Sequence, residues 1–246
     1  MSGSDPANKG AEGIRLNKYI ASSGTCSRRE ADKLIESGKV SVNGVIADLG
    51  TRVFEGDTVE VDGRSVVPED SMIYIAFNKP LGITCTTDRR DPSNIIDYIN
   101  YSERIFPIGR LDKNSSGLIL LTNDGDIVNS LLRSENGHEK EYVVTLDRPY
   151  DKEFIKNMSG GVPVLGRMTL PAEVIPVNPK TFRIILKQGM NRQIRRMCEF
   201  LGYKVTRLKR IRFMNVRLGE LEIGKWRYLT AKEKQELLKD INKKKD

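Results

Sequence analysis

Apolar residues near the N-terminus recur at the spacing of short helices. Leu16 and Ile20 are four residues apart, which places both side chains on one face of a helix. A second helix is expected to begin at Ser27, because Ser27 and Glu30 have the spacing of a capping box and Gly38 stands where such a helix would end. The pattern therefore predicts two short helices in this part of the chain.

Strand-like alternation follows these helices. The run VSVNGVIA alternates around Asn43-Gly44, a dipeptide typical of a two-residue hairpin turn, and TVEVDG predicts one more short strand. We therefore expect a small module at residues 14–62. The preceding residues 1–13 have no apolar core of the kind a secretory signal needs, and we expect them to form a disordered leader.

A longer, irregular alternation of strands and helices begins at Met72. Runs such as MIYIAFNKP, GLILLT and TFRIILK are typical of strands, whereas GDIVNSLLRS, DKEFIKNM and NRQIRRMCEFLG have helical periodicity. Strands and helices mixed in this way, with Gly and Pro turns between them, predict an α+β domain. We assign it residues 72–246, with residues 63–71 as a linker and a last helix capped by Thr230 and Glu233.

Positive charge is concentrated in one block of the chain. Between Lys180 and Arg217 there are twelve Lys and Arg residues and a single acid, Glu199, so this block carries +11. The whole chain carries +8, which leaves −3 for all other residues together. A localised basic patch is what binding to a phosphate backbone requires, and such binding weakens steeply with salt.

Composition argues against several other classes of protein. Hydrophobic residues make up 38% of the chain and no apolar run reaches the length of a transmembrane helix, so we expect no membrane association. Three widely separated cysteines predict no disulfide framework, which fits a cytoplasmic location. With one histidine, His138, and no paired cysteines, a structural zinc site is not expected.

One acid stands in a glycine-flanked loop. The predicted strand RIFPIG ends at Gly109 and the next begins at Gly117, so Asp112 lies in the loop between them. Loops held by a rigid sheet often carry catalytic groups. An ordinary turn aspartate that caps loop amides is the alternative on spacing alone.

Four motifs, in order along the chain, resemble those of the pseudouridine synthases. They are NKPLG at residues 78–82, GRLDKNSSGLILLT around Asp112, EKEYVV around Tyr142, and GMNRQIRRMCEFLGYKVTRLKR. The N-terminal module resembles the S4 RNA-binding domain. Together these features cover nearly the whole chain after residue 14, and they are most similar to the RsuA-like ribosomal subgroup, within it to the type F synthases of the large subunit.

The resemblance implies both a fold and a reaction. The fold is α+β: an S4-like module, then a mixed, mainly antiparallel β-sheet flanked by helices. The reaction cleaves the bond from ribose to N1 of a uridine in RNA, turns the base and rejoins it through C5. Because the atoms are unchanged, no cofactor is expected. The target base must be flipped out of its stack to reach the pocket.

By the same resemblance, six residues take roles in the site. Asp112, Tyr142 and Arg195 are the expected catalytic residues: the carboxylate, the ring that stacks on uracil, and the cation beside the carboxylate. The expected substrate-binding residues are Arg110, Leu208 and Lys79. From the residues alone, Tyr142 could also be a core aromatic and Arg195 a surface arginine. Lys79 is expected to be structural or to face phosphate rather than to be catalytic.

Helix geometry adds support for Arg195. Ile194, Met197 and Cys198 lie at i, i+3 and i+4 and form an apolar stripe. At about 100° per residue, Arg195 falls on the flank of that stripe, whereas Arg196 lies opposite it. Arg195 is therefore the arginine of this helix that can lean inward.

Other basic residues are candidate RNA contacts. We expect contacts from two regions, the polar positions of the N-terminal module and the basic block: Arg15, Lys18, Arg28, Arg29 and Lys33, and Arg192, Arg196, Arg207 and Lys209.

The predicted function is the isomerisation of one uridine in 23S ribosomal RNA by a monomer. Specificity would come from loops and single strands whose bases can be splayed out. Two alternatives stay open: the same reaction on transfer RNA or small-subunit ribosomal RNA, and a non-catalytic RNA-binding protein of ribosome assembly. The sequence does not separate a nucleophilic from a basic role for Asp112.

Overall fold

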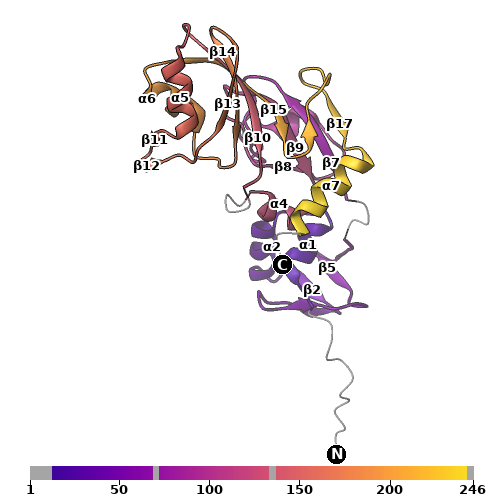
Figure 1. The fold of residues 1–246 in the computed structure, drawn as a ribbon. Coiled ribbons are helices and arrows are strands. Elements are labelled where there is room, and N and C mark those ends of the chain that lie inside the picture. The colour runs from indigo at the N-terminus through magenta and orange to yellow at the C-terminus, as the bar shows by residue number, and fades with distance from the viewer. Residues whose placement is uncertain (1–12, 69–71, 133–136, 243–246) are drawn as a thin grey trace, which may run out of the picture. The chain divides into compact units, whose positions relative to one another are not determined.

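The computed structural model describes residues 13–68, 72–132 and 137–242. The chain divides into two compact units, Met1–Met72 and Ile73–Asp246 (Figure 1). Apart from Gly13, the expected leader lies outside the described residues. None of the helices in the described ranges is long and apolar enough to cross a bilayer.

The Met1–Met72 unit packs two helices, α1 (Leu16–Ser22) and α2 (Arg28–Glu36), over short strands. The predicted capping box is confirmed, because the Glu30 N–H donates to Ser27 Oγ at 3.2 Å and the Ser27 N–H donates to the Glu30 carboxylate at 2.8 Å. Its strands are β1 (Ile14–Arg15), β2 (Val40–Val42), β3 (Val45–Ile46), β4 (Arg52–Val53), β5 (Val59–Val61) and β6 (Arg64–Val66).

Strand β6 lies in the segment that was expected to be linker. It pairs antiparallel with β5 through a two-residue turn at Asp62-Gly63, where φ is +48° and +73°. Asp-Gly is a favoured turn dipeptide because glycine adopts a positive φ without strain. The assignment of residues 63–66 to a linker was therefore wrong: the sheet continues to Val66.

The Ile73–Asp246 unit is built on one sheet whose main path has the order β13-β14-β10-β15-β9-β7-β17. In that order the strands are Glu173–Asn178, Thr181–Leu186, Lys140–Leu146, Val205–Phe213, Ser116–Thr122, Tyr74–Lys79 and Trp226–Tyr228. In addition, β8 (Phe106–Ile108) pairs with β9, and β16 (Val216–Arg217) pairs with β15. Among the described residues every pairing in the sheet is antiparallel except that of β15 with β9, which confirms the expected mixed, mainly antiparallel sheet.

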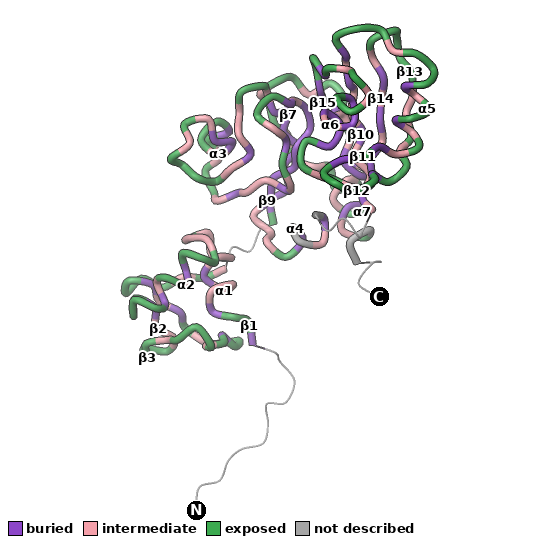
Figure 2. Tube along the Cα trace, turned by 90° about the vertical axis from the view of Figure 1, so that its left-hand side faces the viewer, coloured by how far each residue is buried: buried purple, intermediate pink, exposed green. Residues whose placement is uncertain are grey.

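Helices flank this sheet, as expected (Figure 1). They are α3 (Ile95–Ile99), α4 (Gly125–Leu132), α5 (Lys152–Gly160), α6 (Gln193–Phe200) and α7 (Ala231–Asn242); a small hairpin, β11 (Pro163–Val164) with β12 (Arg167–Met168), lies near α6. Strands β7 and β9 are buried almost along their whole length (Figure 2). The predicted cap of α7 is confirmed, because the Glu233 N–H donates to Thr230 Oγ1 at 3.2 Å.

The parallel contact between β9 and β15 depends on a glycine. Gly117 pairs with Arg210 and has a φ of +102°. A Cβ atom at this position would overlap the backbone of Arg210. Glycine thus lets the two strands approach, which brings the loop before β9 beside the side chains of β15.

Candidate active site

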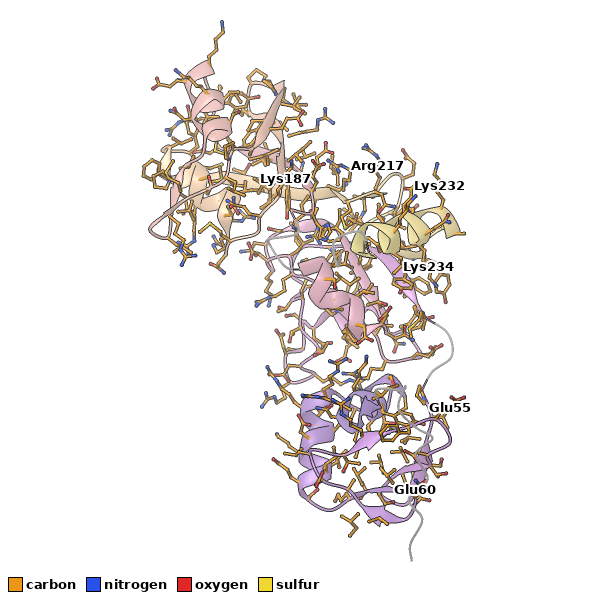
Figure 3. The ribbon with its side chains drawn as sticks, turned by 60° about the horizontal axis from the view of Figure 1, so that its bottom comes forward. Glu55, Glu60, Lys187, Arg217, Lys232 and Lys234 are labelled. Atoms are coloured by element: carbon orange, nitrogen blue, oxygen red, sulfur yellow. The ribbon has the colours of Figure 1, made fainter. Side chains whose placement is uncertain are left out.

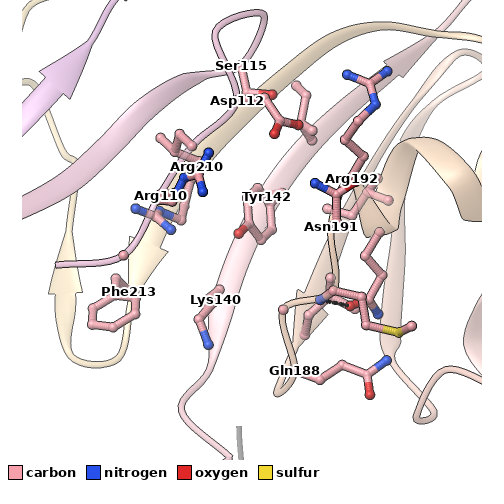
Figure 4. Close-up of a pocket in the computed structure, with 18 of the residues that line it drawn as sticks. Arg110, Asp112, Ser115, Lys140, Tyr142, Gln188, Asn191, Arg192, Arg210 and Phe213 are labelled. Atoms are coloured by element: carbon pink, nitrogen blue, oxygen red, sulfur yellow. Dashed lines mark hydrogen bonds between the residues drawn. The ribbon is translucent and has the colours of Figure 1, made fainter. Parts of the chain in front are cut away.

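A cavity of about 500 Å³ opens in the Ile73–Asp246 unit, next to the parallel strand contact (Figure 4). Four segments far apart in the sequence line it: the loop from β8 to β9, strand β10, residues 186–194, and strand β15. Its lining contains one acid, Asp112, and four basic residues, Arg110, Lys140, Arg192 and Arg210. In the part of the chain that the structure describes, no group of three or more His, Cys, Asp or Glu residues could hold a metal ion.

The loop that carries Asp112 is anchored by its backbone. The Ser115 N–H donates to the Asp112 carbonyl at 2.9 Å, and the Gly82 N–H donates to the Lys113 carbonyl at 2.9 Å. The half-buried side chain of Asp112 points into the cavity toward Tyr142 (Figure 4). Its carboxylate accepts no hydrogen bond from another described residue, so Asp112 is not a turn aspartate that caps loop amides.

Arg195 leans inward from α6 and is only 8% exposed, as its position beside the apolar stripe predicted. Its Nη2 donates to the Asn114 carbonyl at 2.6 Å and to Ser115 Oγ at 3.3 Å, and its Nη1 donates to the Val205 carbonyl at 3.2 Å. Burial lowers the pKa of Arg195, while the charge of Asp112 raises it. Arg195 therefore holds the loop that carries Asp112; among the described interactions it forms no ion pair with the carboxylate itself.

Tyr142 lies on β10, between Ile184 of β14 and Arg210 of β15. The ring is half-buried, packs partly against two of the hydrophobic cores, and lines the cavity. Leu208, 7% exposed, lines the same cavity from β15. Arg110 is exposed and also borders the cavity. The structure thus brings Asp112, Tyr142, Leu208 and Arg110 to one pocket.

Lys79 does not belong to this pocket. Its side chain is fully buried, and its Nζ donates to the carbonyls of Pro80 at 2.9 Å and Ile83 at 2.7 Å. Burial lowers the pKa of Lys79, whereas Cys85 and Asp112 raise it. A fully buried amine that donates to backbone carbonyls cannot contact RNA. The assignment of Lys79 to substrate binding was therefore wrong, and its role is structural.

The candidate RNA contacts differ in accessibility. In the N-terminal unit Lys18 is half-buried. The other four candidates there are exposed: Arg15, Arg28, Arg29 and Lys33. In the other unit Arg192 and Arg207 are exposed, and Lys209 is half-buried. Arg196 is half-buried and donates from Nε to the Asn191 carbonyl at 3.1 Å, so it also secures the turn before α6.

The basic block is not a uniform surface patch. Lys187 and Arg217 are exposed on the unit (Figure 3). Arg195 and Arg210 are buried, and Arg212 forms ion pairs with Glu139 at 3.1 Å and Glu141 at 2.9 Å. Part of the +11 charge therefore stays inside the protein and does not reach the surface.

Sequence reasoning did not select Lys140 and Arg210 as pocket residues. The alternation of side chains along a strand could have identified them. Lys140 shares a face of its strand with Tyr142, and Arg210 shares a face with Leu208. The remaining pocket residues of the 186–194 segment, such as Gln188 and Asn191, had no comparable signal in a loop.

Models of known families match both units. Residues 73–200 match the RNA pseudouridylate synthase family, and residues 14–59 match the S4 domain. A crystal structure of a pseudouridylate synthase has a TM-score of 0.68 and 30% identity, and the match covers 91% of this chain and 99% of that protein.

Relatives with assigned names agree with the family. A dual-specificity RNA pseudouridine synthase RluF from Salmonella typhi is 55% identical, over 92% of this chain and 79% of the relative. The ribosomal large subunit pseudouridine synthase B of Bacillus subtilis is 37% identical, over 91% of this chain and 95% of the relative. The resemblance drawn from the four motifs and the N-terminal module is thereby confirmed: the chain belongs to the RNA pseudouridylate synthase family, in its RsuA-like branch, and is a pseudouridine synthase.

Proposed function

We propose that this chain isomerises a specific uridine of 23S ribosomal RNA to pseudouridine and that Asp112 is the carboxylate that acts at the sugar. One observation carries the proposal. The carboxylate of Asp112 has no hydrogen-bond partner among the described residues, and it points toward Tyr142 in a cavity whose other charged lining residues are all basic.

The uridine would enter the cavity flipped out of its stack, with its ribose at Asp112. Tyr142 and Leu208, both lining the cavity from neighbouring strands, would hold the uracil ring. Arg110, at the rim, would hold the backbone where the base has left. Stacking on an aromatic face is worth about 1–3 kcal/mol per base, which offsets much of the free energy that extruding a base costs.

The bond changes can be written with two roles for Asp112. As a nucleophile it would attack C1′ when the N1–C1′ bond breaks, and C5 would displace it after the uracil has turned. As a base it would remove the C2′ proton, allow N1 to leave, and return the proton after C5 has bonded to C1′. On either route C5 loses its hydrogen and N1 gains one, so the composition of the nucleoside is unchanged.

Arg195 would act mainly through the loop. Its guanidinium binds the Asn114 carbonyl and the Ser115 hydroxyl, so it fixes the position of Asp112 relative to the sugar. A planar group with donors in fixed directions suits three acceptors on two separate segments. We therefore propose that Arg195 positions the Asp112 loop and that its positive charge also favours the ionised form of Asp112 from a distance.

Ribosomal RNA of the large subunit is the favoured substrate. The Bacillus subtilis relative is named for the large subunit, and the S4 domain supports binding to structured RNA. The RluF relatives are named dual-specificity enzymes, which supports a second RNA target, and transfer RNA is the candidate. Such substrates imply a cytoplasmic enzyme; we propose that it acts as a monomer, because the residues assigned to the reaction, Asp112, Tyr142 and Arg110, already meet in one cavity of one chain.

Mapping pseudouridine in cells that lack the chain tests this function. A chemical stop assay on ribosomal and transfer RNA should show one lost position in 23S RNA, restored by the wild-type chain. Asp112→Asn should not restore it, and turnover in vitro should fall by roughly a thousandfold or more because one essential group is removed. If the chain were only an assembly factor, cells that lack it would keep every pseudouridine. If Asp112 were not needed, Asp112→Asn would restore the lost position as well as the wild-type chain does.

A further inference from the structure

Two cations, Lys140 and Arg210, line the cavity near the ring of Phe213. In the register of β10 and β15, Lys140 is opposite Phe213, and Tyr142 is opposite Arg210. Lys140 Nζ lies 5.7 Å from the centre of the Phe213 ring, and Arg210 Cζ lies 5.6 Å from it. Both side chains line the cavity, so two positive charges flank one ring inside the candidate active site (Figure 4).

Neither cation is neutralised by a carboxylate among the described residues. The nearest acids in the sequence, Glu139 and Glu141, are engaged elsewhere: Arg212 pairs with both, and Arg183 pairs with Glu141 at 3.1 Å. Glu141 also faces away from the pocket, because consecutive side chains of a strand point to opposite faces. Of the described residues that line the cavity, Asp112 alone is acidic.

The donors of the two cations are only partly used. Arg210 is 3% exposed, and its Nε donates to the Leu118 carbonyl at 2.6 Å. Within the described chain, the two terminal nitrogens of Arg210 have no acceptor. Lys140 Nζ donates to the His138 carbonyl at 3.0 Å, which leaves two of the three donors of an ammonium group.

Burying a cation without a charged partner is costly. Burial, followed by the charge of Arg210, lowers the pKa of Lys140 to about 8. A protein normally pairs such charges or replaces them with apolar residues. Two unpaired cations with free donors directed at one cavity are the arrangement expected where a bound anion completes the site.

We propose that Lys140 and Arg210 form a phosphate subsite, which holds a backbone phosphate next to the extruded uridine. This inference rests on the proposed function and adds to it which part of the substrate Lys140 and Arg210 recognise. Uracil carries no charge, whereas each linkage of RNA carries one negative charge that charge-assisted hydrogen bonds can hold. Lys140 lies two residues from Tyr142 on the same face of β10, or about 7 Å along the strand, so base and phosphate would be bound by neighbouring side chains.

Uridine 3′,5′-bisphosphate and uridine are suitable probes, because they differ only in the two phosphates. Binding of each to the full chain can be followed by NMR titration without any turnover. The wild-type chain should bind the bisphosphate at least about tenfold more tightly than uridine. Lys140→Met should reduce this preference about tenfold and leave uridine binding nearly unchanged, while Lys140→Arg, which keeps the charge, should retain most of it.

Lys156→Met provides a control with the same change of residue. It removes the same charge from an exposed position of α5 that does not line the cavity, and should leave the bisphosphate preference intact. A folded Lys140→Met chain with the wild-type preference would overturn the subsite, and so would an equal loss in Lys156→Met. Because the probes require no catalysis, these results are independent of whether pseudouridine is formed, which the Asp112→Asn experiment decides.

Discussion

The two faces of strand β10 treat charge in opposite ways. On one face, Glu141 is 3% exposed and is paired with Arg183 and Arg212, which belong to the strands on either side. On the other face, Lys140 and Arg210 line the cavity with no carboxylate partner among the described residues. Strands β10 and β15 contribute to both sets of charges, and β14 contributes only to the first. Charges that hold the sheet together are balanced within the protein, whereas charges in the pocket are left for a ligand to balance.

After the loss of the Asp112 carboxylate itself, the largest effect is expected at Arg195, a buried cation whose terminal nitrogens bind neutral oxygens. Arg195→Lys should reduce single-turnover product formation by roughly 100-fold, because an ammonium cannot reach the Asn114, Ser115 and Val205 oxygens together and the Asp112 loop shifts. RNA affinity should change little, which a filter-binding assay checks. Product formation at the wild-type rate would show that Arg195 does not position the loop.

An effect of similar size, on stability rather than chemistry, tests the face of β10 that carries Glu141. Glu141→Gln leaves Arg212 and Arg183 without their shared carboxylate, and we expect the free energy of unfolding to fall by about 3 kcal/mol. Denaturant unfolding of the wild-type and variant chains measures the difference. The bisphosphate preference should survive in the folded variant; its loss would mean that the two faces are not separate.

Phosphate binding by Lys140 and Arg210 should depend on pH. Since the pKa of Lys140 is lowered to about 8, its charge is present at pH 7 and is largely lost by pH 9. The phosphates of the probe are already ionised above pH 7, and Arg210 stays charged throughout. The preference for bisphosphate over uridine should therefore fall about tenfold as pH rises from 7 to 9.

Lys140→Arg supplies the control for this titration, because its guanidinium does not lose its proton in this range. Its bisphosphate preference should be flat between pH 7 and 9. Besides Arg210, the described interactions of Lys140 are with the Phe213 ring and the His138 carbonyl, neither of which titrates in this range. A wild-type profile as flat as that of the arginine variant would assign the preference to a group other than Lys140.

The smallest effect is expected at the exposed end of β15. Arg207→Met should weaken RNA binding only a few-fold, equally for different RNA sequences, and should reduce the slope of log affinity against log salt by about 1. Binding isotherms at several salt concentrations give both quantities. An effect confined to one RNA sequence would indicate that Arg207 reads bases and not only phosphates.

Local signals in the sequence were sufficient for several features. Ser27 and Glu30 began a helix as predicted, because a capping box involves residues three apart and needs no distant partner. The strand-to-strand loop around Asp112 was also predicted, since the apolar runs and glycines that bound it are contiguous. The hairpin at Asp62-Gly63 was missed although its signal is equally local.

Other features were decided only when distant segments met. Lys79 was expected to be available to phosphate, but its amine is buried and binds the carbonyls of the turn that follows it. Arg210, in contrast, lines the pocket because β15 pairs in parallel with β9. The Nε of Arg210 donates to the carbonyl of Leu118, 92 residues earlier in the chain. The sequence by itself determined the family, the two units and the residues available for chemistry, because these depend on residue types and short spacings. Only the tertiary structure decided which charges are balanced and which remain open, because that depends on which strands become neighbours.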